Sequence, residues 1–294
     1  MTETTITVAV DCQNLLGECP LWHAQEQALY WTDIQGRTLS RHHPESDETR
    51  SWSTPDRVGS FAFCTDGQFL LALPDRIVRW DKQTETTTPV VSALAGQAAG
   101  TRLNDGRCDR QGRFVVGGFD ETTRQPIAGL WRLELDGSVT HLVADGITTS
   151  NSLCFSPDGS TMYFADTPAA TIWAYDYDPA PGAPLGARRV LTDGLEPPGK
   201  PDGSIVDADG FVWNAQVLGS RLVRYAPDGR VDRTVDLPVK NPTCPCFGGP
   251  GLDTLYVTSL RRTGLAEWEP TPIDGSILSL EPGVKGLPEV MFGG

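Results

Sequence analysis

Four polar residues, far apart along the chain, are of types that together could hold a divalent cation. They are two carboxylates and two amides: Glu18, Asn104, Asn151 and Asp202. Two carboxylates held close together raise each other's pKa unless a cation lies between them. Carboxylate and amide oxygens form an all-oxygen site that suits calcium, magnesium or manganese, is compatible with zinc, and leaves positions open for water. The chemistry therefore requires a fold that brings these residues together.

A repeated apolar segment indicates how distant residues could meet. Its six copies are anchored on Tyr30, Leu70, Val115, Tyr163, Val212 and Tyr256. They recur at roughly 40 to 50 residues, which is the period of a β-propeller blade. The four polar residues precede their own anchors by ten to twelve residues. Because the first strand of each blade starts beside the central channel, we expect these residues to line one channel.

The local pattern of each copy predicts β-hairpins. Asp-Gly pairs, such as those at residues 66–67, 136–137 and 209–210, lie between apolar runs, and Gly accepts the positive φ that tight turns need. No long segment keeps a helical period. We predict an all-β, six-bladed β-propeller with four-stranded antiparallel blades and a metal site in the central channel. It forms a single domain over residues 1–294, closed by a strand at Thr5–Val10 that pairs near Glu289–Phe292.

Composition narrows the possible partners and compartment. The chain has 24 basic and 38 acidic residues, a formal net charge of -14, so it should repel nucleic acid. It contains no membrane-length apolar run and no signal peptide, and we expect a cytoplasmic protein that does not bind membranes. Its seven cysteines include no CxxC pair and are expected to be reduced thiols.

Several other kinds of site lack support. The sequence has no G-x-S-x-G, H-E-x-x-H or phosphate-loop motif, and its four histidines are not placed for catalysis. Ser60 and Cys246 take the equivalent place in the second and sixth copies, and we expect them to line the channel without binding metal. Cys246 remains open as a soft ligand or nucleophile, although no histidine is placed to activate it. The four polar residues could also be polar only because the channel is wet.

Several segments resemble the SMP-30/gluconolactonase/regucalcin family, in order and over nearly the whole chain. They include Leu-Gly-Glu-Cys-Pro-Leu-Trp at 16–22, Arg-Leu-Asn-Asp-Gly at 102–106, Ser-Asn-Ser-Leu-Cys-Phe-Ser-Pro-Asp-Gly at 150–159, Pro-Asp-Gly at 201–203 and Leu-Tyr-Val-Thr at 255–258. The resemblance implies a six-bladed propeller with one catalytic divalent ion, of which Ca, Mn, Zn, Mg and Fe(II) are the candidates. It also implies hydrolysis of sugar lactones to aldonic acids.

The resemblance also implies roles for individual residues. Glu18, Asn151 and Asp202 would be the metal ligands, while Arg102 and Asn104 would hold the substrate. Glu121 would contact a further sugar hydroxyl, with Asp120 as the alternative, because Gly117-Gly118-Phe119 departs from the family pattern before them. Long connections at 122–128 and at 261–272, which contains Trp268, are expected to influence specificity.

We expect metal-dependent hydrolysis of a pentono- or hexono-1,4- or 1,5-lactone, acting in oxidative sugar catabolism. Asp202 would also accept a proton from the attacking water, because a positioned carboxylate suits that step. The partner is then a small sugar lactone; the sequence leaves the oligomeric state open, and a monomer is compatible with it. Two alternatives remain: a calcium-binding regulatory protein of the regucalcin type, and a propeller scaffold without chemistry.

Overall fold

The computed structural model describes residues 5–193, 199–261 and 270–294. Within them, twenty-four strands form six four-stranded antiparallel sheets. The fold-class prediction, an all-β chain of six propeller blades with four antiparallel strands each, is confirmed. The described residues form one helical turn, the 3-10 turn η1 at Thr167–Ala169. None of the helices in this part of the chain is long and apolar enough to cross a membrane.

The chain divides into two compact units, and each unit contains three blades. Unit 1 comprises Met1–Arg57 and Leu195–Glu289, and unit 2 comprises Val58–Gly194 and Val290–Gly294. That the whole chain acts as a single domain stays a prediction. The two units are described separately below.

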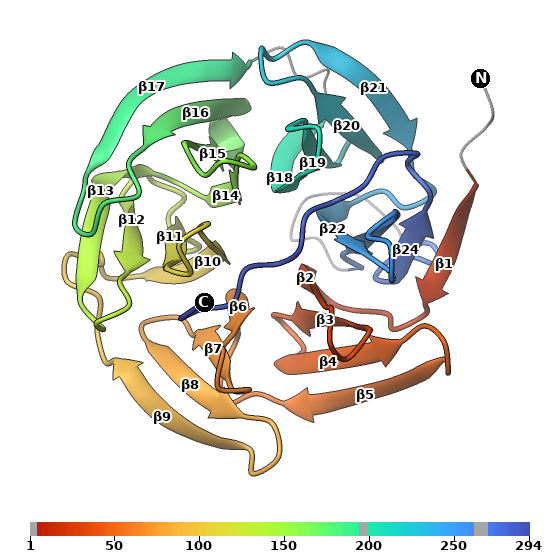
Figure 1. Cartoon of the computed structure of the whole chain (residues 1–294), viewed down its shortest axis with the longest axis horizontal. Coiled ribbons are helices and arrows are strands. Elements are labelled where there is room, and N and C mark those ends of the chain that lie inside the picture. The colour runs from red at the N-terminus through yellow and green to blue at the C-terminus, as the bar shows by residue number, and fades with distance from the viewer. Residues whose placement is uncertain (1–4, 194–198, 262–269) are drawn as a thin grey trace. The chain divides into compact units, whose positions relative to one another are not determined.

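Unit 2 contains three blades made of consecutive strands (Figure 1). The first has β6 Ser60–Phe63, β7 Phe69–Ala72, β8 Ile77–Asp81 and β9 Thr86–Val91; the second has β10 Thr101–Cys108, β11 Phe114–Asp120, β12 Ala128–Leu133 and β13 Val139–Ile147; the third has β14 Ser150–Phe155, β15 Thr161–Asp166, β16 Thr171–Tyr177 and β17 Leu185–Thr192. Within this unit β6, β10 and β14 lie on one side, while β9, β13 and β17 form the opposite edge.

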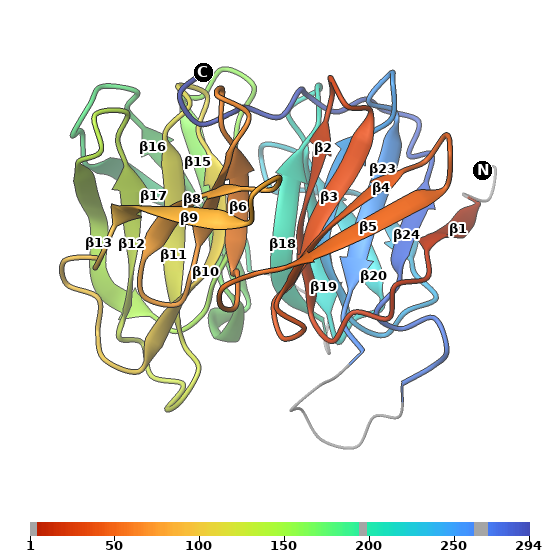
Figure 2. The ribbon, with the colours of Figure 1, turned by 90° about the horizontal axis from the view of Figure 1, so that it is seen from below.

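Unit 1 contains the other three blades, one of which is completed by the N-terminal strand. The blades are β2 Gly17–His23, β3 Ala28–Asp33, β4 Thr38–His43 and β5 Glu48–Ser53; β18 Lys200–Val206, β19 Val212–Val217, β20 Arg221–Tyr225 and β21 Val231–Asp236; and β22 Pro242–Gly248, β23 Thr254–Ser259, β24 Ile277–Leu280 and β1 Ile6–Val10. Figure 2 shows the twist of a blade in β2 to β5, where each strand is inclined to the one before it.

The N-terminal strand is the outer strand of the last blade, as predicted, but its predicted partner was wrong. β1 pairs with β24, and Val8 lies opposite Leu278. Residues 289–292 contain no strand, and Phe292 instead forms an isolated bridge with Cys64 inside unit 2. The tail carries no alternating pattern, whereas Ile277–Leu280 supplies the apolar residues that pack against Leu255 and Val257.

Burial falls from the inner to the outer strands of a blade. All six residues of β3 are buried, whereas five of the six residues of β5 are exposed. The second strands carry the apolar anchors, and each must be apolar on both faces because it packs between neighbouring layers. Four tryptophans that reach almost no solvent fill these layers: Trp31, Trp80, Trp131 and Trp213. Their burial removes a large apolar area from water and stabilises the blades.

Five of the six first strands contain a β-bulge, in which one additional residue stands opposite the second strand. The register shifts lie between Glu18 and Leu21, Leu103 and Gly106, Asn151 and Cys154, Pro201 and Ser204, and Pro242 and Pro245. In the remaining blade β6 pairs with β7 without a shift. A bulge turns side chains away from the regular pleat, and bulges occur often beside functional sites.

Candidate functional site

All four predicted polar residues lie in or next to a bulge, but their positions relative to it differ. Glu18 and Asn151 are the last regularly paired residues before a bulge, opposite Thr32 and Ala165. Asn104 and Asp202 lie inside the bulge of their own strands. Their sequence offsets from the anchors are similar because the additional residue of each bulge falls within that interval.

We predicted that Cys246 takes, in the last blade, the position that the four polar residues take in theirs. This prediction was wrong. Its bulge holds Thr243 and Cys244, while Cys246 pairs regularly with Tyr256. Cys246 is buried, and its thiol donates to the Phe247 carbonyl at 3.2 Å. Counting residues back from the anchor missed the bulge, whose presence depends on pairing between strands.

Two of the bulges place a non-glycine residue in the left-handed region directly after a predicted metal ligand. Cys19 follows Glu18 with φ 48°, and Ser152 follows Asn151 with φ 62°. This conformation costs an L-residue roughly 1–2 kcal/mol. Strained residues of this kind concentrate at functional sites because surrounding structure must hold them there.

In unit 2, a chain of hydrogen bonds joins three of the predicted residues. Arg102 Nη1 donates to Asn104 Oδ1 at 2.7 Å and to the Leu103 carbonyl at 3.0 Å. Asn104 Nδ2 donates to the Ser150 carbonyl at 2.8 Å and to Asn151 Oδ1 at 3.2 Å. Arg102, Asn104 and Asn151 are each less than one-tenth exposed. The structure therefore brings together Arg102, Asn104 and Asn151 from two neighbouring blades.

A glycine permits this close approach. Gly117 lies opposite the bulge of β10, and a Cβ atom there would overlap the side chain of Ser150. Any larger residue would push β14 away from β11 and break the short hydrogen bonds of Asn104. On the other side, Ser60 Oγ donates to the Asn104 carbonyl at 2.7 Å. Ser60 thus supports the strand that carries Asn104.

Glu121 and Asp120 have different roles although they are adjacent. Arg102 Nε lies 3.5 Å from Glu121 Oε1, and the Glu121 side chain is 32% exposed. Asp120 is buried, and its carboxylate accepts from the backbone of Thr122, Thr123 and Gln125 at 2.8–3.1 Å and from the Thr123 hydroxyl. These bonds, led by that of the Thr123 hydroxyl, lower the pKa of Asp120 to about 2. The geometry favours Glu121 over Asp120 as the carboxylate able to meet a ligand.

An aromatic ring adjoins the same arginine. The guanidinium carbon of Arg102 lies 4.8 Å from the centre of the Phe119 ring, and that of the exposed Arg124 lies 4.5 Å from it. Cation–π contact of this kind holds a guanidinium in place without neutralising its charge. Phe119 therefore helps to fix Arg102 while leaving its hydrogen-bonding capacity intact.

In unit 1, the strands of Glu18 and Asp202 both contact the bulge of β22. Thr243 Oγ1 donates to the Gly17 carbonyl at 2.5 Å, next to Glu18. A Cβ atom at Gly203 would overlap Cys244, so only glycine can follow Asp202 here. Glu18 is half-buried and Asp202 is 7% exposed. Both carboxylates are thus placed on strands that pack against opposite flanks of one bulge.

The donor set is one that a hard cation accepts. Asn151 Nδ2 donates to Thr167 Oγ1 at 2.8 Å, so its oxygen end is turned the other way and keeps a second lone pair beyond the bond from Asn104. Among the described residues no group of three or more His, Cys, Asp or Glu side chains is placed to hold a metal. The predicted ligands are two carboxylates and one amide, so they include a residue type outside such groups. The Asn151 amide is oriented as a ligand would be, with its oxygen away from Thr167.

The cysteines show no sign of reactive thiols. All seven are free, and all except Cys12 are buried. Burial raises the pKa of Cys64 and of Cys154 to about 12 and that of Cys12 to about 11. A thiol with so high a pKa is not a nucleophile near neutral pH. The expectation of reduced, space-filling cysteines agrees with this structure.

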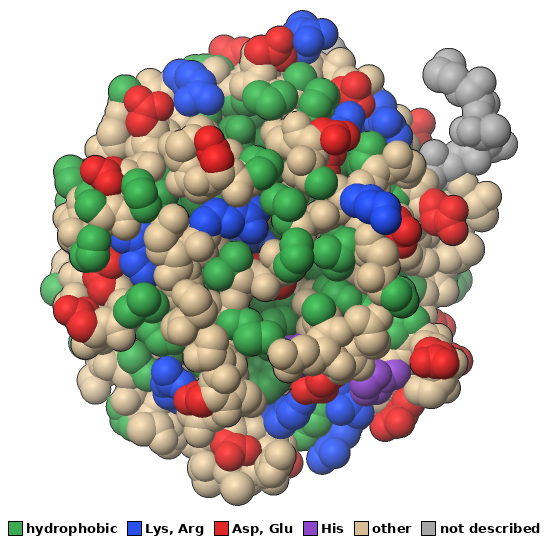
Figure 3. Space-filling view, viewed as in Figure 1, with side chains coloured by type: hydrophobic (Ala, Val, Ile, Leu, Met, Phe, Trp, Pro, Cys, Tyr) green, Lys and Arg blue, Asp and Glu red, His purple; other side chains and the backbone are tan. Residues whose placement is uncertain are grey.

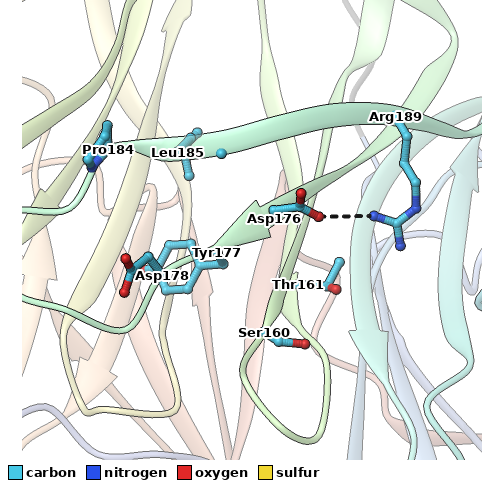
Figure 4. Close-up of a pocket in the computed structure, with 9 residues that line it drawn as sticks. Ser160, Thr161, Asp176, Tyr177, Asp178, Pro184, Leu185 and Arg189 are labelled. Carbon is cyan, nitrogen blue, oxygen red and sulfur yellow. Dashed lines mark ion pairs between the residues drawn. The ribbon is translucent and has the colours of Figure 1, made fainter.

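A surface pocket of about 810 Å³ lies elsewhere in unit 2 (Figure 4). Its lining includes Thr161, Asp176, Tyr177, Leu185 and Arg189, and the dashed line in the figure is the exposed Asp176–Arg189 ion pair at 3.9 Å. This pocket contains none of the predicted site residues.

Figure 3 shows acidic and basic side chains interspersed over the described part of the face that it presents. Trp268, which belongs to the connection at 261–272 predicted to influence specificity, lies outside the described residues.

A family profile, described as the SMP-30/Gluconolactonase/LRE-like region, matches residues 16–261. The chain belongs to this family. The resemblance drawn from its motifs is therefore confirmed. Among members of the SMP-30/gluconolactonase family, an L-arabinolactonase of Azospirillum brasilense is 39% identical over 89% of this chain and 86% of its own length. A 6-deoxy-6-sulfogluconolactonase of Pseudomonas putida is 34% identical over 99% of both chains.

A solved structure of the same family shares the fold over its full length. It is a calcium-binding protein, regucalcin, from Agrobacterium tumefaciens, with a TM-score of 0.90 and 30% identity. The match covers 99% of this chain and 98% of that one. The family thus includes proteins named for sugar lactone hydrolysis and proteins named for calcium binding.

Sequence reasoning missed three residues of this site. Thr167 holds the amide of Asn151, the Phe119 ring adjoins Arg102, and Arg124 adjoins the same ring. A signal existed for Thr167, since the Asp166-Thr167-Pro168 segment ends the second strand of the same blade as Asn151. The contact of Phe119 with Arg102 depends on the register of β10 against β11, in which the two residues are paired, and that of Arg124 depends on how the loop after β11 folds back.

Proposed function

We propose that this protein is a metal-dependent sugar lactonase that hydrolyses a pentono- or hexono-1,4- or 1,5-lactone to the aldonic acid. The observation that carries the proposal is the oriented set Arg102–Asn104–Asn151, which combines ligand-binding groups with an amide oxygen suited to a hard cation. The names of the relatives support the same reaction class. We infer a role in oxidative sugar catabolism and retain the cytoplasm as the expected compartment.

The residues that would hold the proposed cation are Glu18, Asn151 and Asp202. This assignment follows the matching family motifs and the chemistry of the donors. When bound, a divalent ion polarises the lactone carbonyl and offsets the negative charge that develops on its oxygen. Calcium, manganese, zinc, magnesium and Fe(II) remain the candidates.

The chain's own residues bind the substrate and handle the proton. Arg102 offers several donors in a fixed plane, and Asn104 can donate and accept at once, so both suit a polyhydroxylated ring. The Arg102 Nε to Glu121 Oε1 distance of 3.5 Å is longer than an ordinary hydrogen bond, so this ion pair can open to admit a sugar hydroxyl. Asp202 would accept a proton from water as that water bonds to the carbonyl carbon; the ring C–O bond then breaks, and Asp202 passes this proton to the ring oxygen.

A lactone panel tests this proposal. Pentono- and hexonolactones are assayed with metal-stripped protein and after addition of each candidate metal, and every rate is taken above spontaneous hydrolysis. We expect at least one five- or six-carbon lactone, with a pentonolactone favoured, to be hydrolysed only with metal. An acyl-homoserine lactone serves as the control, because its tail gains little from polar contacts. Preference for that control, or full activity without metal, would refute the proposal.

The structural likeness to the calcium-binding regucalcin supports a second candidate, a calcium-binding protein whose catalysis is secondary. The same panel separates the two. Tight calcium binding without hydrolysis of any sugar lactone would favour the regulatory protein, whereas turnover with another metal would exclude calcium binding as the main activity.

A further inference from the structure

The hydrogen bonds around Asn104 fix which end of its amide is which. Arg102 can only donate, so the atom that it meets must be the Asn104 oxygen. The Ser150 carbonyl can only accept, so the atom that meets it must be the Asn104 nitrogen. The two ends of this amide therefore have fixed partners of opposite kinds, and a flipped Asn104 would face a donor with a donor.

The orientation of Asn151 follows from that of Asn104. The same Asn104 nitrogen also faces the Asn151 side chain at 3.2 Å, which must therefore present its oxygen. The Asn151 nitrogen is then left at the other end, where Thr167 Oγ1 accepts from it at 2.8 Å. Thr167 thus completes a polarised sequence of side chains that begins at Arg102.

The place of Thr167 in the fold is well defined. It is the first residue of η1, and its backbone N–H donates to the Thr149 carbonyl at 3.1 Å. The neighbouring Asp166 carboxylate accepts from the N–H groups of Thr148 and Thr149 at 3.1 and 2.8 Å. These bonds tie the start of η1 to the strand that carries Asn151, so the Thr167 hydroxyl is held at a set distance from the amide.

We propose that Thr167 is a positioning residue, which restrains rotation of the Asn151 side chain so that the oxygen selected by the Asn104 N–H stays available to a divalent cation. An amide that flips presents N–H groups to the cation and cannot bind it. The Asn104 bond alone, at 3.2 Å, is the longer of the two that hold Asn151, and loss of the Thr167 hydroxyl leaves it as the main constraint. This inference rests on the proposed function, since Asn151 must be a metal ligand.

The test uses Thr167→Val, which removes the hydroxyl but keeps the side-chain shape, and Thr167→Ser, which keeps the hydroxyl. Calorimetric titration of the metal-stripped full chain with Ca²⁺ and with Mn²⁺ gives the Kd directly, without reference to activity. Removing a group that orients a metal ligand typically weakens binding by about 10 to 100-fold. We expect at least a tenfold weaker Kd in Thr167→Val and less than a twofold change in Thr167→Ser.

Thr171→Val is the matched control, because the Thr171 hydroxyl donates to the Ala169 carbonyl just beyond η1 and does not contact Asn151. It should leave the Kd unchanged. Equal Kd values for Thr167→Val, Thr171→Val and the wild type would overturn the inference while leaving the metal site standing. Absence of any binding by the wild type would instead refute the proposed metal site and the inference with it.

A second variant separates orientation from packing. Asn151→Asp replaces the amide with a carboxylate, whose two oxygens are equivalent, so there is no orientation to maintain. In an Asn151→Asp background, Thr167→Val should change the Kd by less than twofold. If Thr167→Val weakens binding equally in both backgrounds, its hydroxyl acts through general packing and the inference is wrong.

Discussion

The two ends of strand β10 carry two arginine clusters that differ in how completely their charges are satisfied. The turn-end cluster, just beyond the strand, consists of Asp109, Arg113, Arg132, Glu134 and Tyr177. Asp109 Oδ2 lies 2.6 Å from Arg113 and accepts from the Tyr177 hydroxyl at 2.8 Å, while Arg132 Nε donates to Glu134 at 2.7 Å. All four charged residues are nearly inaccessible to solvent. Two positive and two negative charges balance each other here.

The bulge-end cluster, near the start of the same strand, consists of Arg102, Asn104, Glu121, Asn151 and Thr167. Its ion pair, between Arg102 and Glu121, is longer, at 3.5 Å, and the Glu121 side chain is 32% exposed. Its two amides are oriented by neighbours yet retain lone pairs. The comparison teaches that buried charge alone does not mark a site: a closed network stabilises the fold, while an oriented but open one can bind a ligand.

The turn-end cluster should contribute mainly to stability, and Asp109→Ala tests this most strongly. Removing one partner from a buried ion pair leaves the other charge uncompensated and typically costs about 3–5 kcal/mol. Urea unfolding should show a loss of that size. Asp66→Ala, which breaks the exposed pair with Arg79, is the control and should cost less than about 1 kcal/mol. If Asp109→Ala lowered the free energy of unfolding by less than Asp66→Ala does, the turn-end cluster would not stabilise the fold.

Asp105 lies between the two ends of β10, and its charge should make stability depend on pH. Burial raises its pKa from 3.8 to about 6, although the bond from the Leu153 N–H and the charge of Arg107 lower it. Between these values the folded protein keeps a proton that the unfolded chain has lost. Its contribution to stability is therefore largest at acid pH and falls as the pH rises towards 6.

Asp105→Asn should remove this pH dependence, because its oxygen can still accept from Leu153 but it carries no charge. Relative to the wild type, the variant should gain stability above pH 6 by no more than about 3 kcal/mol, since one pKa unit corresponds to about 1.4 kcal/mol. Unfolding measured between pH 4 and 8 checks the sign. The prediction would be contradicted if the wild type became more stable, relative to Asp105→Asn, as the pH rises from 4 to 8.

The adjacent acidic residues of the bulge end sharpen the comparison. Glu121→Gln should reduce kcat/KM for a hydrolysed lactone about tenfold, chiefly through KM, because a charged hydrogen bond is worth roughly 1.5–3 kcal/mol. Its thermal midpoint should stay near that of the wild type. Asp120→Ala should instead lower the midpoint, because its carboxylate holds the following loop. If Glu121→Gln unfolds early and keeps its KM, the two roles are reversed.

Local sequence patterns predicted the blades well. The geometry of the site was harder to predict, because it depends on the register in which strands pair. Asp-Gly turns and apolar anchors identify hairpins because both signals lie within a few residues. Whether Asn104 falls inside a bulge and Asn151 before one depends on pairing with another strand. The partner of β1 was missed for the same reason, since Ile277–Leu280 is distant in sequence.

The motif resemblance supplied residue types and roles that periodicity could not. It named Arg102 and Glu121 together, and the structure places them in one ion pair. It left open whether Asp120 or Glu121 meets the ligand, because the difference lies in how the loop at 121–127 folds around Asp120. Thr167 emerged only from the direction of hydrogen bonds, which sequence does not specify.

The central proposal is that Glu18, Asn151 and Asp202 bind one and the same ion. Calorimetric titration of Mn²⁺ into the metal-stripped wild type, Asp202→Asn, Asn151→Ala and Asp109→Asn tests it most directly. We predict one site per chain in the wild type and in Asp109→Asn, and loss of that site in Asp202→Asn and in Asn151→Ala. Unchanged binding in Asp202→Asn or in Asn151→Ala, or no binding by the wild type, would contradict the claim.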